Sequence, residues 1–410
     1  LSGPAAGVIG AFRLAQQAGF DQIITLDIGG TSTDVALCPG EPVLRTETEI
    51  DGLPLRVPVI DINTVGAGGG SLARIDAGGA LRVGPQSAGA NPGPIVYGRG
   101  GQTLTVTDAN ALLGRIDPAH FLGGAMALDL EPARQALDSL AGQMDITPHE
   151  AAQGIVAIAN ANIVQAVRRV SVERGYDPAD FTLVAFGGAG PLHACEVADQ
   201  LGIRRVLMPR YPGVLCAYGL LTANIVHTYS RTAIKNVTDE TLTELHRNLG
   251  EMIAVAQADL RDEGLGDEQI TCFGSLDMRY RGQSYELTVP FTEDVVTQFH
   301  AAHRRRYGFA VPQRAVEAVT LRVQAVGTTE KPASDAEPCV DHVAQPASTY
   351  RPPFGDTSET IAVFERDALT PGARFSGPAL IVQLDCTTFV PVGWDCVVDG
   401  YRNIIAEYGG

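Results

Sequence analysis

A glycine turn between two buried strands is the feature that most constrains this chain. Residues 22–28 form an apolar run typical of a buried strand, Gly29-Gly30-Thr31-Ser32-Thr33-Asp34 follows, and residues 35–37 predict the return strand. Glycines let a phosphate approach the backbone, and the amides and hydroxyls of such a turn form a small anion nest. Asp27, at the end of the first strand, can hold a magnesium-bound water. A tight β-hairpin with a polar turn is the alternative interpretation.

A second glycine turn follows another buried strand. Residues 182–186 are apolar, Gly187-Gly188-Ala189-Gly190 comes next, and Pro191 opens a helix. Glycines at a strand-to-helix junction let a nucleotide lie against the backbone, and the helix N-terminus offers unpaired amides. A close packing turn is again the alternative. Because both turns end buried strands, we expect them to lie on one wall of a single cleft.

Several common catalytic motifs are absent from the sequence. It holds no G-x-x-x-x-G-K-[ST] loop, no H-E-x-x-H pair and no G-x-S-x-G elbow. Because 47 acidic residues oppose 30 basic ones, the net charge is −17, and we expect neither nucleic acid nor a membrane surface as a partner. The seven cysteines include no C-x-x-C pair, so we interpret them as reduced thiols in a cytoplasmic protein.

The patterning predicts an α/β protein, because 45% of the residues are apolar and strands alternate with helices. Residues 1–232 carry both glycine turns, 233–330 read as an α+β domain, and 331–410 read as a linker with a small β-rich tail. Twelve of the 46 glycines lie between residues 66 and 101, so the surplus marks particular loops. Helices are predicted at 4–18, 130–143, 148–174, 191 onward, 212–221, 239–262 and 294–307, and further strands at 42–50, 53–60, 205–208, 270–290 and 315–326.

Longer motifs in a fixed order give a specific resemblance. They are Ser2–Gly7, Asp27–Asp34, Thr64–Ser71, Val106–Asn110, Val170–Gly175, Ala185–His193 and Arg281–Leu287. Together they resemble the hydantoinase A / 5-oxoprolinase (N-methylhydantoinase A) family of the actin-like ATPase superfamily, strongly to about residue 330 and weakly beyond it. The resemblance implies an actin-like (ribonuclease H-like) ATPase lobe followed by a C-terminal α+β domain.

The resemblance also implies a site for ATP and Mg²⁺. Its second phosphate motif corresponds to Asp27 as catalytic and metal-binding residue, with Gly29, Gly30, Thr31, Ser32 and Thr33 at the phosphates. Its adenosine motif corresponds to Gly187, Gly188 and Gly190. Ser2–Gly7 and Ala217–Gly219 resemble the connecting helices of the interlobe hinge. The superfamily's first phosphate motif should lie upstream and is absent, so we expect the N-terminal lobe to be missing or on another chain.

The implied reaction is the ATP-dependent opening of a cyclic amide such as a hydantoin, 5-oxoproline or another lactam. Phosphorylation of the carbonyl oxygen would turn a poor electrophile into one that water can attack, and a B-type subunit is the implied partner. An ATP-dependent ketone carboxylase subunit is the first alternative. A non-enzymatic, nucleotide-gated reactivating chaperone is the second.

The sequence leaves the role of several further residues open, because each could belong to the site or be purely structural. Asp61 could serve as a second metal or base carboxylate, or be a solvated strand-end aspartate. Residues 66–71 could cradle a ligand or form a packing turn, and Asp108 and His193 could contact a ligand or serve as cap or core. Arg168, Arg169, Glu173 and Arg174 could line the adenine pocket, whereas His300, His303 and Arg304–Arg306 read as surface or partner contact. Asn63, Asn91 and Ile95-Val96 depart from the family pattern, which leaves the substrate open.

Overall fold

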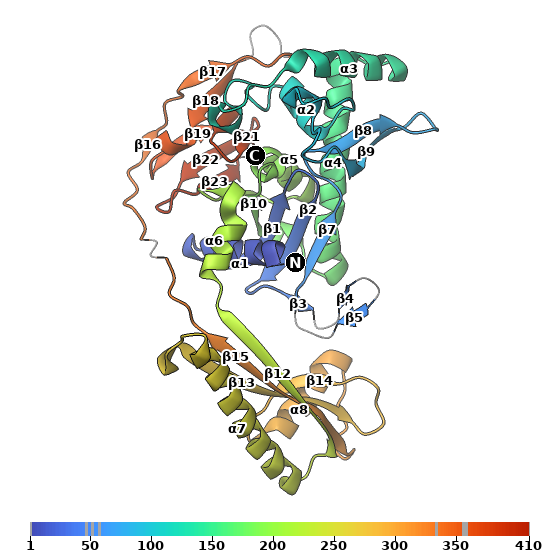
Figure 1. Cartoon of the computed structure of the whole chain (residues 1–410), viewed down its shortest axis with the longest axis vertical. Coiled ribbons are helices and arrows are strands. Elements are labelled where there is room, and N and C mark those ends of the chain that lie inside the picture. The colour runs from blue at the N-terminus through green and yellow to red at the C-terminus, as the bar shows by residue number, and fades with distance from the viewer. Residues whose placement is uncertain are drawn as a thin grey trace. The chain divides into compact units, whose positions relative to one another are not determined.

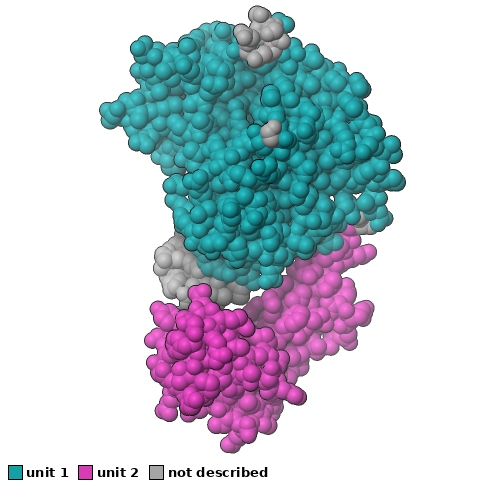
Figure 2. Space-filling model, turned by 180° about the vertical axis from the view of Figure 1, so that it is seen from behind, with its two compact units in different colours: residues 1–221, 333–410 teal, residues 222–332 magenta. Residues whose placement is uncertain are grey.

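The computed structural model describes residues 2–45, 48–50, 53–55, 59–332, 335–354 and 360–409. They form two compact units (Figure 2), of which unit 1 comprises residues 1–221 and 333–410 and unit 2 comprises residues 222–332. Each unit combines helices and sheets, as the predicted α/β class requires. Among the described residues, no helix has the length and apolar character needed to cross a membrane.

Unit 1 is built on a nine-stranded sheet (Figure 1). β1 (Gln22–Ile28) pairs antiparallel with β2 (Thr33–Pro39) on one side and parallel with β10 (Thr182–Phe186) on the other, and β10 pairs parallel with β11 (Arg205–Met208). The strand–turn–strand and the parallel crossover predicted from the sequence are therefore present. In order across the sheet the strands are β16 (His342–Val343), β19 (Ala373–Ser376), β22 (Trp394–Val398), β23 (Ile404–Tyr408), β11 (Arg205–Met208), β10 (Thr182–Phe186), β1 (Gln22–Ile28), β2 (Thr33–Pro39) and β7 (Ile62–Val65).

Helices cover both faces of this sheet because the central strands are apolar on both sides. In β1, Ile23 packs with α1 (Ser2–Gln17) and α6 (Leu215–Thr222), whereas Ile24 and Leu26 pack with α4 (Pro148–Val170) and α5 (Gly190–Leu201). α1 and α6 approach closely through small residues: a Cβ on Gly10 would lie 3.0 Å from the Cα of Gly219. Small residues in the two expected hinge helices therefore serve close helix packing.

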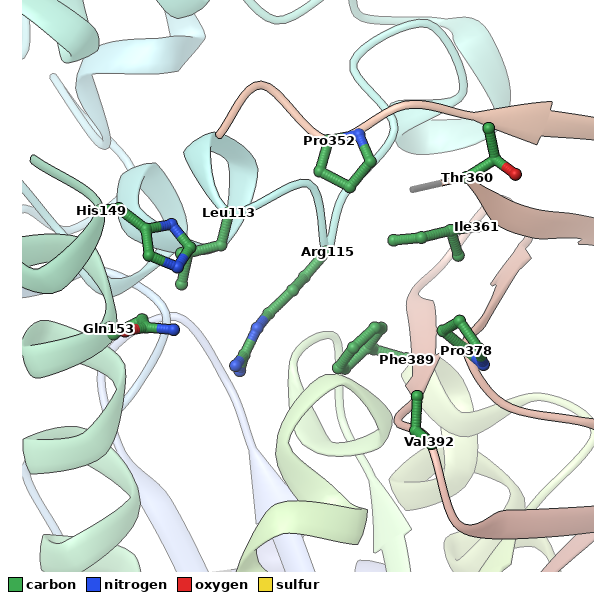
Figure 3. A pocket seen from close by; sticks show the side chains of 10 residues that line it. All are labelled: Leu113, Arg115, His149, Gln153, Pro352, Thr360, Ile361, Pro378, Phe389 and Val392. Atoms are coloured by element: carbon green, nitrogen blue, oxygen red, sulfur yellow. The ribbon is translucent and has the colours of Figure 1, made fainter. Parts of the chain in front are cut away.

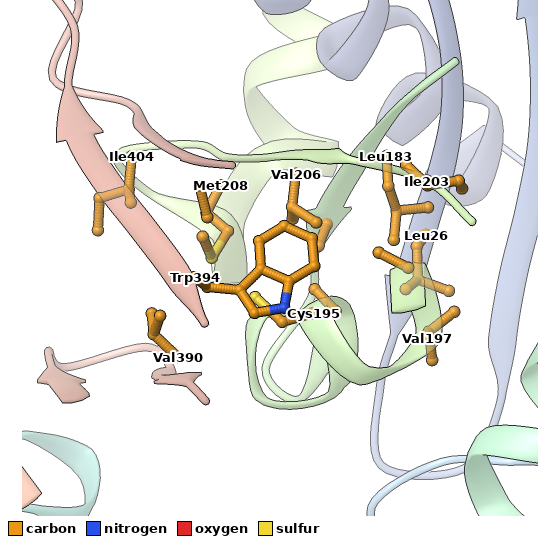
Figure 4. Close-up of a cluster of buried hydrophobic side chains, with 14 of the residues drawn as sticks. Leu26, Leu183, Cys195, Val197, Ile203, Val206, Met208, Val390, Trp394 and Ile404 are labelled. Carbon is orange, nitrogen blue, oxygen red and sulfur yellow. The ribbon is translucent and has the colours of Figure 1, made fainter. Parts of the chain in front are cut away.

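The C-terminal segment differs from the separate β-rich tail that the sequence predicts. β23 pairs antiparallel with β11, with Ile404 opposite Met208, and thereby extends the main sheet. Trp394 of β22 is fully buried in the core against α5 (Figure 4), and its indole N–H donates to Asp199 at 3.3 Å. Residues 335–354, expected to belong to the linker and tail, hold two short strands, β16 and β17 (Ser348–Tyr350); residues 333–334 and 355–359 lie outside the described residues. β17 joins a second sheet with β18 (Ile361–Glu365), β20 (Ala379–Val382) and β21 (Thr387–Val390).

Between β7 and α4 the chain makes a long excursion that supplies six of the residues lining the candidate site. Its regular elements are β8 (Ser71–Ile75), β9 (Leu81–Ser87), α2 (Val106–Leu112) and α3 (Leu130–Met144). α2 begins at a capping box, in which Asp108 accepts from the Thr105 N–H at 2.8 Å and also from the Val96 N–H at 2.8 Å. Asp108 is fully buried, and burial raises its pKa. Asp108 is therefore a cap and not a substrate contact.

The strands predicted at 42–50 and 53–60 are only partly described. The structure gives β3 (Leu44–Arg45) paired with β6 (Val59–Ile60), and β4 (Thr48–Ile50) paired with β5 (Leu53–Leu55). The remainder of both predictions at 46–47, 51–52 and 56–58 lies outside the described residues.

Unit 2 is a four-stranded antiparallel sheet with two helices. The sheet order is β12 (Ile225–Asn236), β15 (Val316–Gly327), β13 (Ile270–Tyr280) and β14 (Leu287–Pro290). α7 (Asp239–Asp262) begins at the Thr238 cap, and α8 (Val295–Tyr307) ends at Gly308. Both helices bury apolar residues such as Leu260 and Phe299 in one core with Tyr280 of β13.

Candidate nucleotide-binding site

The turn between β1 and β2 presents free backbone amides at its tip. The Gly29 N–H donates to the Ser32 carbonyl at 3.0 Å, which closes the turn, and Gly30 and Thr31 are exposed. Among the described residues, no group accepts a hydrogen bond from the N–H of Gly30 or Thr31. Two adjacent unpaired amides in a tight turn form the concave donor surface that anions bind.

Asp27 lies beside this turn and is held partly out of water. Burial raises the pKa of the Asp27 carboxyl, and the nearby Asp34 carboxylate, its cross-strand neighbour, raises it further. The Cys216 thiol of α6 donates to Asp27 Oδ2 at 3.4 Å and acts in the opposite direction. Burial and the carboxylates raise the pKa of Cys216 to about 12, so this residue stays a protonated donor.

The glycine-rich loop at residues 66–71 packs against the turn between β1 and β2 and is hydrogen-bonded to it. The N–H groups of Gly69 and Gly70 donate to the carbonyls of Gly29 and Gly30 at 3.0 and 2.7 Å. A Cβ on Gly68 would lie 2.8 Å from the Gly29 oxygen, so only glycine permits this approach. The Thr33 hydroxyl is fully buried and donates to the Ala67 carbonyl. Its proton is therefore not free to bind a phosphate, as the resemblance implied for this residue. The loop is therefore mainly a packing turn.

The second glycine turn lies next to the first because β1 and β10 are parallel neighbours, with Asp27 opposite Phe186. Gly187 has φ +80°, and a Cβ there would collide with the Asp27 carboxylate and the Ile28 carbonyl. Gly188 is exposed and has room for a side chain, since the nearest atom to its Cβ is the Asp385 oxygen at 3.7 Å. Gly190 is buried at the start of α5 against the backbone of β1, and this close packing explains why the position is a glycine.

A cavity of about 230 Å³ opens between the two turns and the excursion. Its aromatic wall contains Tyr97 and Phe121, whose ring centroids are 5.5 Å apart. Thr107 lines it too, although its hydroxyl donates to the Gly69 carbonyl at 2.8 Å. The full lining is Gly29, Gly30, Gly69, Tyr97, Thr107, Ile116, Phe121, Leu122, Gly188, Ala189, Leu192, Leu384, Asp385, Cys386 and Thr387.

The aromatic wall and the 384–387 segment were missed by the sequence reasoning. No local motif marks Tyr97 or Phe121 as site residues. Asp385 belongs to the segment predicted as a separate tail, yet it accepts from the Gly213 N–H at 2.8 Å and lines the cavity. The long-range pairing of β23 with β11 and the Gly213–Asp385 hydrogen bond bring this segment to the glycine turns.

Asp61 is not brought together with Asp27. β7 ends beside the glycine turn, where Val65 pairs with Thr33, so Asp61 lies at the far end of that strand. It is buried and paired with Arg45, at 2.5 Å, and with Arg174. The Asp61 carboxylate is therefore not solvated, as the structural interpretation of the sequence expected. It is also not placed to bind a metal beside Asp27, as the alternative interpretation expected. Arg174 is likewise committed to Asp61 and not to an adenine pocket, and Arg168, Arg169 and Glu173 are exposed.

His193 is part of a buried polar chain. Burial and the Arg115 cation lower the pKa of His193 to about 3, so the ring is neutral. Its Nδ1–H donates to Asn160 Oδ1 at 2.7 Å, and Asn110 Nδ2 donates to its Nε2 at 3.2 Å. Asn160 in turn donates to Glu196 at 2.8 Å, and Glu196 accepts from Arg115. His193 thus joins α2, α4 and α5 behind the cavity and does not line it.

The three departures from the family pattern lie apart from the cavity. The Asn63 amide donates to the Ala166 carbonyl at 3.3 Å, Asn91 is exposed, and Val96 is fully buried. Val96 bears on the site indirectly, because its N–H bond to Asp108 fixes the segment that carries Tyr97.

A larger cavity of about 460 Å³ lies elsewhere in unit 1. Figure 3 shows Arg115, His149 and Phe389 facing it from different elements. The Arg115 guanidinium is already paired with both oxygens of Glu196, at 2.8 and 2.6 Å. None of the residues assigned to nucleotide from the sequence lines this cavity, so the smaller one is the candidate site.

Two family models together match nearly the whole chain. The family model described as hydantoinase/oxoprolinase matches residues 1–229, and the one described as hydantoinase/oxoprolinase C-terminal domain matches residues 232–407. Caprolactamase subunit alpha of Pseudomonas jessenii is 36% identical over 97% of this chain and 60% of its own length. 5-Oxoprolinase 1 of Arabidopsis thaliana is 33% identical over 99% of this chain and 34% of its own length.

A solved structure is similar over nearly the whole chain. The nucleotide-free acetone carboxylase, described in the context of ATP-dependent acetone carboxylation, superimposes with a TM-score of 0.87 at 27% identity. The match covers 99% of this chain and 61% of that one, so the chain spans less than two thirds of the length of these relatives. The α/β fold expected from the sequence is thereby confirmed, and the chain belongs to the hydantoinase/oxoprolinase family.

Proposed function

We propose that this chain forms one wall of the ATP site in an enzyme that opens a cyclic amide at the expense of ATP. The observation that carries the proposal is the adjacency of the two glycine turns at the ends of β1 and β10, with a cavity between them. The amides of Gly30 and Thr31 would receive phosphate oxygens. The apolar cavity lined by Tyr97, Phe121 and Leu192 would receive the flat adenine ring.

The site also fits Mg²⁺. Across the described parts of the chain, no cluster of three or more His, Cys, Asp or Glu side chains is arranged to hold a metal by itself. Mg²⁺ commonly binds through one or two carboxylates together with substrate phosphates, so a dedicated protein cage is not needed. Asp27 would be the protein ligand, beside the free amides of the turn. The Asp61 carboxylate, paired with two arginines, would not take part.

The proposed reaction uses ATP to activate a carbonyl. Transfer of the γ-phosphoryl group of ATP to the carbonyl oxygen of a lactam would release ADP and make the carbonyl carbon a better electrophile. Water would add to this carbon, and the C–N bond would then break as the ring nitrogen takes up a proton. A second water would hydrolyse the resulting acyl phosphate to a carboxylate and phosphate. The residues of this chain would contribute positioning and charge neutralisation, which dominate catalysis of phosphoryl transfer. Gly30 and Thr31 would orient the phosphates, and the ionised Asp27 would hold the metal. The proposal places the other half of the phosphate site in the N-terminal lobe, and a B-type subunit beside it.

Carboxylation of a ketone is the second candidate, and the similarity to acetone carboxylase favours it. Phosphate release by the full-length protein with its B-type subunit distinguishes the two. Release that depends on a hydantoin, 5-oxoproline or caprolactam supports the first proposal. Release that requires a ketone together with bicarbonate supports the second, and release without any small molecule contradicts both.

A further inference from the structure

Asp385 is the one charged residue among the described residues that line the candidate nucleotide cavity. It lies in the short connection from β20 to β21 and is half-buried. The function proposed above gives this residue no task. A carboxylate in a cavity for ATP is unexpected, because it repels the like charge of the phosphates. It would weaken nucleotide binding unless it accepts hydrogen bonds from the nucleotide.

The segment that carries Asp385 reaches from the aromatic wall of the cavity to the second glycine turn. A Cβ on Gly123 would lie 3.4 Å from Leu384 Cδ1, so Leu384 borders the turn that contains Phe121. A Cβ on Gly188 would lie 3.7 Å from the Asp385 carbonyl oxygen. Asp385 therefore lies between the part of the cavity proposed for adenine and the glycine turn at the end of β10.

Hydrogen bonds fix the Asp385 carboxylate in this place before any ligand binds. The Gly213 N–H donates to Asp385 Oδ2 at 2.8 Å, and the neighbouring Pro212 carbonyl accepts from the Gly187 N–H at 3.0 Å. The Gln383 side chain donates to Asp385 Oδ1. A carboxylate has about four acceptor positions, so about two remain after the bonds from these described residues. A ligand would therefore meet a positioned acceptor, which reduces the entropy cost of binding.

The donors of a nucleotide are the hydroxyls of its ribose and the exocyclic amine of its adenine, whereas its ionised phosphates offer none. Two remaining acceptor positions on one carboxylate match two neighbouring hydroxyls. An acidic side chain binds a ribose hydroxyl in this way in dinucleotide-binding folds. The ribose also joins the base to the phosphates, as Asp385 lies between the aromatic wall and the glycine turn.

We propose that Asp385 binds the ribose hydroxyls of the nucleotide and makes the site selective for ribonucleotides. The proposal rests on the proposed function, in which this cavity holds ATP. The competing explanation is purely structural, because Asp385 also holds the Gly213 N–H. A structural role predicts changes in stability and an equal loss of affinity for every nucleotide. A role in ribose binding predicts a loss that depends on the sugar.

The test compares the affinity of the full-length protein for Mg-ATP with its affinity for the magnesium complex of dideoxy-ATP, which lacks both ribose hydroxyls. Calorimetry measures both. The wild type should bind ATP at least tenfold more tightly, because hydrogen bonds to a charged group are among the stronger ones. In Asp385→Ala the acceptor is gone, so the two Kd values should differ by less than about twofold.

Two further variants separate ribose binding from stability. Asp385→Asn keeps an oxygen that can accept from the Gly213 N–H, so it should melt like the wild type and still lose most of the preference for ATP. Asp177→Ala is the matched control. The Asp177 carboxylate is exposed, accepts from the Ala179 N–H at 3.0 Å, precedes β10 and lies outside the cavity lining. This variant should keep the wild-type preference.

Equal affinity of the wild type for the two nucleotides overturns the proposal, as does a preference for ATP that persists in Asp385→Ala and in folded Asp385→Asn. A third nucleotide, inosine triphosphate, lacks the adenine amine. If Asp385→Ala removed a preference for ATP over inosine triphosphate and left the ribose preference intact, Asp385 would contact the base and the proposal would be wrong. In these cases the wild type still binds Mg-ATP, whereas failure of the nucleotide site itself would appear as no binding of Mg-ATP at all.

Discussion

The Cys216 thiol lies 3.4 Å from the Asp27 carboxylate and donates a hydrogen bond to it from α6. This bond lowers the pKa of Asp27, whereas burial and Asp34 raise it. If the ionised Asp27 is needed for turnover, Cys216→Ala should raise its pKa and move the acid limb of the kcat profile to higher pH. Cys216→Ser keeps a donor and should restore most of the profile. An acid limb that does not move in Cys216→Ala would show that the contact has no catalytic consequence.

Asp27→Asn in the full-length protein should lose turnover without losing the fold. If Asp27 holds the metal as proposed, removal of its carboxylate is expected to lower kcat by about 100-fold or more. Because the folded-state pKa of Asp27 is raised, the ionised carboxylate destabilises the fold above that pKa, and the neutral amide removes this cost. The variant should therefore melt at the wild-type temperature or slightly above it at pH 7. A folded variant with near-normal turnover would mean that the turn is only a hairpin.

His193 should make stability depend on pH. Its pKa is about 3 in the fold against about 6.5 in an unfolded chain, so the unfolded state binds a proton that the folded state excludes. The free energy of unfolding should fall as the pH drops from about 6.5 towards 3, by up to about 1.4 kcal/mol per pH unit. Urea titrations at pH 7, 6 and 5 measure this slope. His193→Gln should be less stable than the wild type at pH 7, and its free energy of unfolding should depend less steeply on pH. An equally steep dependence in the variant would mean that other groups cause it.

Local signals in the sequence were enough to predict several elements, among them the strands that lead into the two turns. The buried runs at β1 and β10, the capping box of Thr147 and Glu150 before α4, and the periodicity of α7 each lie within one short stretch. The adjacency of the turns then follows from parallel pairing of β1 and β10. Prediction of the individual elements needed no information from distant residues.

The remainder of the site depends on contacts between residues far apart in the sequence. The local sequence gives no sign that Asp61 is paired, because its partner Arg174 lies more than a hundred residues later in the chain. Asp385 reaches the cavity because β23 pairs with β11, which joins the C-terminal segment to the main sheet, and because the Gly213 N–H donates to Asp385. The Thr33 hydroxyl is used by the Ala67 carbonyl, a contact that no turn propensity specifies.

The isolated 410-residue chain should bind Mg-ATP weakly, with a millimolar Kd or worse. In the proposal it supplies one phosphate turn and one adenosine turn, and the other phosphate turn lies in a further lobe. Calorimetry on this chain and on the full-length protein compares the two directly. Micromolar binding by the 410-residue chain alone would contradict the division of the cleft between two lobes.

The most direct test of the nucleotide site is the affinity of full-length Gly188→Val for Mg-ATP, measured by calorimetry beside Gly187→Val. Gly188 has no positive φ and has room for a side chain, so its valine should leave the melting temperature nearly unchanged while filling ligand space. Gly187 has φ +80° and no room, so its valine should destabilise the apo protein by about 1 kcal/mol or more. We predict that Gly188→Val raises the Kd for ATP at least tenfold, roughly 1.4 kcal/mol, in a protein that melts normally. An unchanged ATP affinity in folded Gly188→Val would contradict the assignment of this turn to the nucleotide.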